Sequence, residues 1–166
     1  GHVCLSGESL LGLDSRQIWQ RGVGRTFQMA SVFQSLTVLE NILVAINASA
    51  HRSHRVWGTV DALAESKAMS FLEQVGLADQ AHRACHALAY ADVKRLELAM
   101  VLVHQPKLLL MDEPTAGVDA ASRHVLMQIV KRLVQQLNLA VLFTEHSMDV
   151  VFGYSDRVIA MSQGQI

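Results

Sequence analysis

The chain has 166 residues, 51% of them hydrophobic, which is enough for one globular domain with a sizeable core. A formal net charge of −1 provides no general basic field, so we expect no nucleic-acid partner. No apolar run reaches the roughly 18–20 residues of a membrane span, and no charged-then-apolar leader opens the chain, which predicts a soluble, cytoplasmic protein. Cys4 and Cys85 lack the spacing of a metal site or a disulfide framework and are expected to be reduced thiols.

The first two thirds of the sequence predict short strands with one short helix between them, followed by three longer helices. Thr37 and Glu40 have the spacing of a capping box, so a helix is expected to start there. Gly76 is expected to end the next helix, and Pro106 to follow the third. In chain order we expect a strand over 1–7, a short helix near 15–20, a strand from 22 leading into a loop at 28, and helices from 37, over 60–75 and over 92–103.

The pattern then changes to that of a layered α/β fold. Short, continuously apolar runs are typical of strands buried on both faces of a parallel sheet. They alternate here with amphipathic segments at helical spacing. We expect a strand over 108–111, a helix over 120–137, a strand over 139–144, a helix over 147–154 and a last strand over 157–161.

The strongest functional signal is the pair Asp112 and Glu113, which directly follows the apolar strand at 108–111. Ligands of parallel α/β sheets bind at the carboxyl ends of the strands, where one carboxylate can hold magnesium and a second can orient or deprotonate water. Gln28 ends the strand that begins at Gly22, and His146 follows the strand over 139–144. Polar residues at three strand ends indicate one site, although each alone is also compatible with an ordinary loop residue or helix cap.

These motifs, in this order and spacing, resemble the ATPase subunits of ATP-binding-cassette (ABC) transporters over essentially the whole chain. Residues 24–28 resemble the family's Q-loop, 108–113 its Walker B strand and 116–119 its D-loop, and His146 resembles its switch histidine. Residues 25–28, 36–41 and 145–151 are most similar to importers of branched-chain amino acids, urea or short amides.

The resemblance implies an α/β fold: a P-loop NTPase core, here incomplete, with a parallel sheet and a helical subdomain. It divides the chain into a remnant of the core with the Q-loop (1–30), a helical subdomain that ends in the signature motif (31–92), and core with Walker B, D-loop and switch histidine (93–166). ATP and Mg²⁺ are the implied cofactors. The implied partners are transmembrane permease subunits, which choose the solute, and a second copy of the chain, with a location at the cytoplasmic side of the inner membrane.

The resemblance also assigns roles. Asp112 and Gln28 would contact magnesium, and Glu113 and His146 would be catalytic, with Glu113 activating water and His146 contacting the γ-phosphate. Nucleotide contacts would come from Gln28 of the Q-loop, from the signature motif and from the D-loop. The signature-motif residues are Ala89, Tyr90, Ala91 and Asp92, and the D-loop residue is Asp119. Ala91 departs from the family pattern, since glycine there would let the backbone approach phosphate more closely.

The larger departure is that no G-x-x-x-x-G-K-[ST] loop occurs in the sequence; Leu13 and Asp14 stand where a loop from Gly7 would need lysine and serine or threonine. In the family this loop lies upstream of what is here Gly1, so we expect the chain alone to bind ATP weakly at best, with no cofactor retained, and to be inactive. The alternative to an ATPase subunit is a non-enzymatic fragment that oligomerises or binds other chains. A DNA-repair ATPase is disfavoured because residues 31–88 contain no heptad coiled-coil arm.

Two surfaces follow from the resemblance. Met29, Val32, Phe33 and Leu36 are expected to form a partly exposed patch for a permease helix, although Leu36 also suits a buried staple. The family's Walker A strand lies between the strands expected at 139–144 and 157–161, so we expect a strand or helix of another copy to cover that gap. The alternative is that these two strands close together within one monomer.

Overall fold

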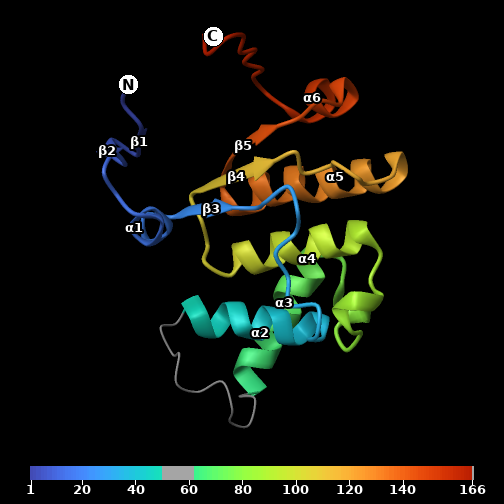
Figure 1. Cartoon of the computed structure of the whole chain (residues 1–166). Helices are drawn as coiled ribbons and strands as arrows, with labels where there is room; N and C mark the ends of the chain where they lie inside the picture. Colours follow the sequence, from blue (N-terminus) through green and yellow to red (C-terminus); the bar gives the residue numbers. More distant parts are fainter. Residues whose placement is uncertain (50–61, 166) are drawn as a thin grey trace.

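The computed structural model describes residues 1–49 and 62–165, and its centre is a three-stranded parallel sheet in the order β3-β4-β5. Figure 1 shows the helices α2, α3 and α4 gathered on one side of this sheet, with both chain ends at the opposite end of the molecule. The elements are β1 (Cys4–Leu5), β2 (Glu8–Ser9), α1 (Ser15–Gln20), β3 (Val23–Arg25), α2 (Val38–Ser49), α3 (Ala62–Val75), α4 (Tyr90–Leu102), β4 (Leu108–Asp112), α5 (Ala120–Leu137), β5 (Ala140–Thr144) and α6 (Met148–Tyr154), with 3-10 turns at Ala78–Gln80 and Cys85–Ala87.

The central strand β4 explains why the run at 108–111 is continuously apolar. It pairs in parallel with β3 on one side (Gly24 opposite Leu109) and with β5 on the other (Leu109 opposite Val141). Leu109 and Met111, which share one face of β4, are buried, whereas Leu108 and Leu110 on the other face are only half-buried, so the expected burial on both faces is incomplete. The predicted parallel α/β sheet is therefore confirmed, and the carboxyl ends of its strands lie at one edge.

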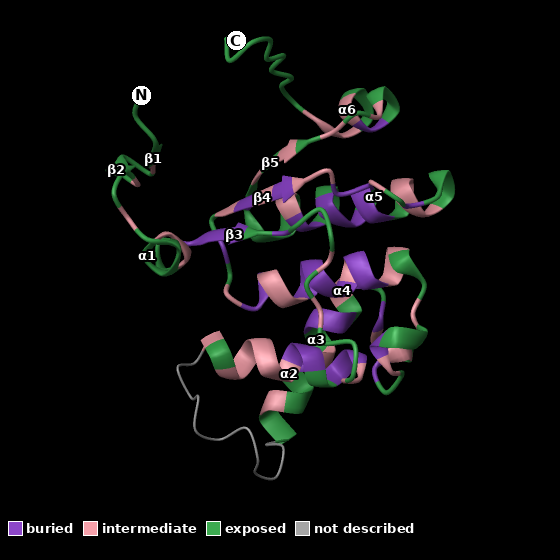
Figure 2. Ribbon diagram, viewed as in Figure 1, coloured by how far each residue is buried: buried purple, intermediate pink, exposed green. Residues whose placement is uncertain are grey.

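Most of the hydrophobic core lies among the helices, and the sheet contributes Leu109 and Met111. Figure 2 shows the buried residues concentrated in α4, β4 and the faces of α2, α3 and α5 that point toward them. Leu98 of α4, Leu109 of β4 and Leu126 of α5 belong to one contiguous cluster. Packing on one face of β4 and pairing with β3 and β5 on both edges fix the strand end that carries Asp112.

Helix α2 begins at the predicted capping box. The backbone amide and the hydroxyl of Thr37 donate to the Glu40 carboxylate at 2.7 and 2.9 Å, and the Glu40 amide donates to the Thr37 hydroxyl at 3.2 Å. These reciprocal bonds satisfy amides that a helix start leaves free. Helix α3 then ends at Val75, before Gly76 with φ +70°, as predicted; residues 60–61 of that prediction lie outside the described residues.

The last predicted strand, over 157–161, is wrong. These residues form no strand, and Val158, Ile159 and Met161 are more than half exposed. The physical reason is that a strand needs a hydrogen-bonding neighbour, and in the described part of the chain β5 pairs only with β4. The alternative in which this segment closes against β5 within one monomer is therefore also wrong for this structure.

Candidate functional site

The structure brings the ends of β4 and β5 together at one edge of the sheet. Asp112 and Thr144 are direct partners in the parallel ladder, and the Thr144 hydroxyl donates to Asp112 Oδ1 at 2.9 Å. The Glu113 amide lies 3.2 Å from both the carbonyl and the hydroxyl oxygen of Thr144. Thr144 thus fixes both acidic residues through backbone and side chain.

Glu113 has an unusual backbone conformation, with φ +45°. A left-handed conformation is unfavourable for a residue with a Cβ and is found preferentially at functional positions. Here it turns the chain directly after β4 and starts the turn to Ala116, whose amide donates to the Glu113 carbonyl at 3.0 Å. The turn sets the direction in which the Glu113 carboxylate leaves the strand.

Three predicted site residues meet at the Glu113 carboxylate. The Gln28 amide nitrogen donates to Oε2 at 2.9 Å, and His146 Nε2 lies 2.9 Å from Oε1. The Glu113 side chain is 26% exposed, whereas that of His146 is 87% exposed. The cluster is therefore open to solvent on the His146 side, and each carboxylate oxygen still has a lone pair for a further donor such as water.

Asp112 lies beside this cluster with its second oxygen largely free. Its Oδ2 is 3.9 Å from a guanidinium nitrogen of Arg25, and both side chains are at least half exposed. An ion pair of this length and exposure contributes little to stability. Asp112 Oδ2 is thus an accessible hard oxygen ligand of the kind that Mg²⁺ prefers, and the Gln28 side-chain oxygen is a second one, because the amide nitrogen is already bonded to Glu113.

Glu145 is an organising residue that the sequence analysis did not single out. Its Oε1 accepts the Thr115 amide at 2.9 Å and also the Thr115 hydroxyl, and its Oε2 accepts the His146 amide at 3.1 Å. It therefore ties the loop after Glu113 to the segment that carries His146. The sequence feature that could have indicated this role of Glu145 is its position between the end of a predicted strand and His146.

The signature-like segment forms the start of α4. Ala89 is the N-cap and makes no side-chain cap bond, and Tyr90, Ala91 and Asp92 form the first turn. Asp92 forms an ion pair with Arg95 and accepts from the Gln80 amide at 2.9 Å. Tyr90 joins this segment to the Glu113 cluster, because its hydroxyl donates to the Gln28 carbonyl at 3.3 Å.

Asp119 is the N-cap of α5. Its carboxylate accepts the Ser122 amide at 3.0 Å, and hydrogen bonds from the side chain and amide of Ser122 lower the pKa of Asp119. Within one chain, the geometry gives Asp119 the role of a helix cap.

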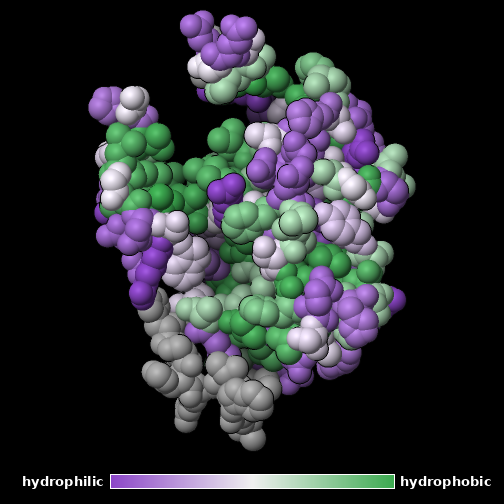
Figure 3. All heavy atoms as spheres, viewed as in Figure 1, coloured by the Kyte–Doolittle hydropathy of each residue, from purple (hydrophilic) through white to green (hydrophobic). Residues whose placement is uncertain are grey.

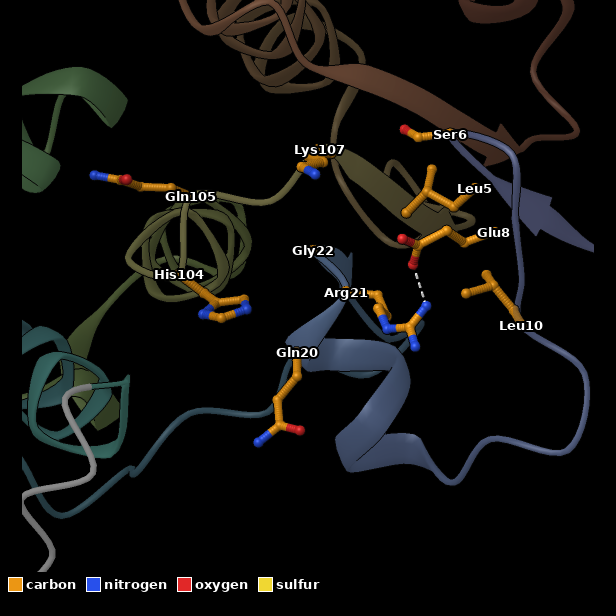
Figure 4. Close-up of a pocket in the computed structure, with 10 residues that line it drawn as sticks. All are labelled: Leu5, Ser6, Glu8, Leu10, Gln20, Arg21, Gly22, His104, Gln105 and Lys107. Atoms are coloured by element: carbon orange, nitrogen blue, oxygen red, sulfur yellow. Dashed lines mark hydrogen bonds and ion pairs between the residues drawn. The ribbon is translucent and has the colours of Figure 1, made fainter.

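A surface pocket of about 530 Å³ lies elsewhere, between the β1–β2 hairpin, α1 and the connection from α4 to β4 (Figure 4). Arg21 and Glu8 form an ion pair in its wall, and His104 and Lys107 line the opposite side. No predicted site residue lines this pocket. The pocket and the cluster around Glu113 are therefore different places on the molecule.

Comparison with known proteins agrees with this geometry. The model of the ABC transporter family matches residues 1–116. The branched-chain amino acid transport ATP-binding protein LivG of Escherichia coli K12 is 36% identical over 171 residues, covering 99% of this chain and 67% of the relative. BraF of Pseudomonas aeruginosa, also a branched-chain amino acid transport ATP-binding protein, is 34% identical over 178 residues with the same coverage. The chain belongs to the ABC transporter family.

The fold agrees as well. An ATP-binding cassette of an ABC transporter solved in its ADP conformation superposes with a TM-score of 0.83 at 26% identity, covering 99% of this chain and 66% of that one. A nucleotide-free cassette gives a TM-score of 0.80 at 25% identity. The α/β architecture is thus that of the family's P-loop NTPase core. The chain spans about two thirds of the length of these relatives.

Proposed function

We propose that this chain supplies the water-activating part of the nucleotide site in the ATP-hydrolysing subunit of an ABC importer for branched-chain amino acids. The observation that carries the proposal is the convergence of Gln28 and His146 on the Glu113 carboxylate, with Asp112 alongside. The solute class is supported by the names of the relatives LivG and BraF.

Glu113 acts as the group that orients and deprotonates the attacking water. The Glu113 amide is bonded to Thr144, which fixes the backbone, and the two carboxylate oxygens are in contact with Gln28 and His146. Such preorganisation places the base without reorganisation during the reaction. His146, being exposed, is free to turn from Glu113 toward a bound γ-phosphate.

Asp112 and Gln28 would hold Mg²⁺, because they present carboxylate and amide oxygens beside the Glu113 cluster. When bound to ATP, the ion neutralises phosphate charge. The 166 residues contain no phosphate-cradling G-x-x-x-x-G-K-[ST] loop. We therefore expect this chain alone to bind Mg²⁺-ATP more weakly than micromolar by titration calorimetry and to hydrolyse none above a Glu113→Gln control.

Residues 89–92 and Asp119 act across an interface between two copies. The start of α4 has no side-chain cap, and the amides at a helix start favour an anion such as a phosphate of the facing copy. Ala91 is half-buried and narrows this approach relative to glycine without removing the amide donors.

The permease contact lies just after the Q-loop. Met29 and Phe33 are 82% and 51% exposed, while Val32 and Leu36 are half-buried. Exposed apolar side chains next to Gln28 suit a helix of a membrane subunit. No helix among residues 1–49 and 62–165 is long and apolar enough to cross a bilayer. By its family resemblance, and through the patch beside Gln28, the chain would join the membrane as a peripheral subunit on the cytoplasmic side.

The free edge of β5 is a further contact surface. Leu142 is 59% exposed, and β5 has no partner on one edge in the described part of the chain. Figure 3 shows hydrophobic side chains on the surface between the amino-terminal segment and the sheet. An unpaired, apolar strand edge favours pairing with another chain. The isolated chain would therefore self-associate through this edge, which is also how a non-enzymatic fragment would act.

Uptake of leucine tests the proposed function. The chain is grafted into E. coli LivG in place of the two thirds that it matches, and the graft is expressed in a strain that lacks LivG. We expect restored uptake of radiolabelled leucine, and none with the matched Glu113→Gln graft. Equal restoration by both grafts would refute the role of Glu113, and failure of a folded graft to restore uptake would refute the assignment to this importer class.

A further inference from the structure

One face of α4 is directed at the Q-loop segment, residues 27–31. Tyr90, Lys94 and Glu97 follow one another at spacings of four and three residues, so they lie on the same side of the helix. Each of them hydrogen-bonds to residues 27–31. The contacts join segments that are more than 60 residues apart in the sequence.

Lys94 binds the backbone immediately around Gln28. Its ammonium group donates to the Phe27 carbonyl at 3.0 Å and to the Gln28 carbonyl at 2.6 Å, and the residue is only 4% exposed. Hydrogen bonds from a charged donor are stronger than neutral ones and fix geometry more tightly. Tyr90 donates to the same Gln28 carbonyl.

Glu97 binds both ends of the turn. Its Oε1 accepts the Phe27 amide at 3.1 Å and the Ser31 amide at 3.2 Å. The residue is 4% exposed, and its Oε2 has no hydrogen-bond partner in the described structure. One buried carboxylate oxygen thus closes the loop that carries Gln28.

Tyr90 extends this contact to the loop after Glu113. Gly117 has φ +74°, and a Cβ added there would lie 3.2 Å from the Tyr90 ring. The ring therefore packs closely on Gly117 while its hydroxyl holds the Gln28 carbonyl. The start of α4 touches the segments on both sides of the Glu113 cluster.

A gain in stability does not explain why Lys94 and Glu97 are charged residues at buried positions. Burial lowers the pKa of Lys94 and raises that of Glu97, which shows that each charge is held against a desolvation cost. Taking a charged side chain out of water costs free energy, so buried charges are a poor source of net stability. Buried ionic groups that all bind one short segment are instead suited to fixing the position of that segment.

We propose that Tyr90, Lys94 and Glu97 are positioning residues that clamp residues 27–31 to α4 and so hold the Gln28 amide on Glu113. A displacement of α4 would then move Gln28 with it. The catalytic consequence rests on the proposed function, but the clamp itself is a property of the chain without nucleotide. It can therefore be tested whether or not the ATPase assignment holds.

The first test is amide hydrogen exchange of the isotope-labelled 166-residue chain, measured by NMR without nucleotide. Glu97→Ala is expected to speed exchange at Phe27 and Ser31 about tenfold to a hundredfold beyond any change in the slowest core amides. Glu97→Gln keeps the acceptor oxygen and is expected to retain most of the protection. Unchanged exchange at both amides in Glu97→Ala would overturn the clamp.

The second test reports on Gln28, which none of the substitutions alters. In Lys94→Met and Glu97→Ala, the Gln28 side-chain amide resonance is expected to move toward its position in Glu113→Ala, where the acceptor is gone. Tyr90→Phe, at a partly exposed site, provides a mild variant that is expected to fold and to show a smaller shift in the same direction.

The matched control is Leu133→Ala, a buried core change in α5. It lowers stability without altering the α4 face that binds residues 27–31, so the Gln28 resonance is expected to stay at its wild-type position. An equal shift in this control would show that Lys94 and Glu97 act only through stability and would overturn the proposal. A wild-type resonance in Lys94→Met, Glu97→Ala and Tyr90→Phe would overturn it as well.

Discussion

Gly24 in β3 faces its neighbours so closely that one added methyl group is expected to disturb the domain. A Cβ at this position would lie 2.5 Å from Cγ1 of Val101 in α4 and 3.2 Å from the ring of Pro106. Neither neighbour yields easily, because valine has one strongly preferred rotamer in a helix and the proline ring is rigid. We therefore expect Gly24→Ala to lower the free energy of unfolding by about 2–3 kcal/mol, the upper part of the range for overpacked cores.

Urea denaturation measures this effect as a lower midpoint with an unchanged slope. Val101→Ala removes the clashing methyl group, so the double variant should recover about 1–2 kcal/mol relative to the sum of the single changes. Gly153→Ala in α6 is the matched control: nothing lies within 4 Å of its added Cβ, and it should be neutral or stabilising. A Gly24→Ala protein within about 0.5 kcal/mol of wild type, or no coupling to Val101, would refute this reasoning.

Three further predictions concern the capping box and the two exposed surfaces. Hydrogen bonds from Thr37 lower the pKa of Glu40, so the ionised Glu40 carboxylate stabilises the fold above its unfolded pKa, and this stabilisation is lost as the pH falls through the folded pKa. Thr37→Ala should lower the free energy of unfolding by about 1 kcal/mol at pH 7. In urea denaturation at a series of acidic pH values, the variant should also lose less stability with falling pH than the wild type does. Met29→Asp with Phe33→Asp should weaken permease co-purification of the LivG graft without changing its melting temperature, whereas unchanged assembly would count against the docking patch. Leu142→Asp should shift the isolated chain toward monomer in light scattering, and a monodisperse wild-type monomer would contradict self-association through β5.

The elements that the sequence predicted well have local signals at both ends. Helix α5 starts after Asp119, whose side chain caps it, and ends before Asn138, which adopts a left-handed conformation with φ +50°. The strand β4 was recognisable because a continuous apolar run is typical of a central strand of a parallel sheet. Asp112 and Glu113 could be placed at the site for the same reason, since the end of such a strand is fixed by the sheet.

The segment at 157–161 shows where that reasoning stops. Val158 and Ile159 have the apolar, β-branched character of a strand, but this pattern forms a strand only where a neighbouring strand shares its hydrogen bonds. The structure provides no such neighbour in its described residues, so the segment stays extended from the domain and exposed. The residues of a segment show that it could form a strand, but not whether a neighbouring strand is present to pair with it.

Lys94 and Glu97 could not have been predicted as loop contacts. In the sequence they are ordinary polar residues of an amphipathic helix, which usually face solvent. Their burial depends on the path of residues 27–31, which reach α4 from a distant part of the chain. Thr144 and Glu145 were missed for a similar reason, because their roles depend on the register between β4 and β5.

The most direct test of the central claim is the steady-state Mg²⁺-ATPase rate of the purified LivG graft, measured with and without the Glu113→Gln substitution at matched folding. This substitution preserves the shape of the side chain but replaces one carboxylate oxygen by an amide nitrogen, so the basic oxygen and one of the two acceptors for Gln28 and His146 are lost. The account predicts that turnover falls about 10²- to 10⁴-fold while Mg²⁺-ATP binding is retained. A turnover within about tenfold of the unsubstituted graft would contradict the assignment of Glu113 as the water-activating group.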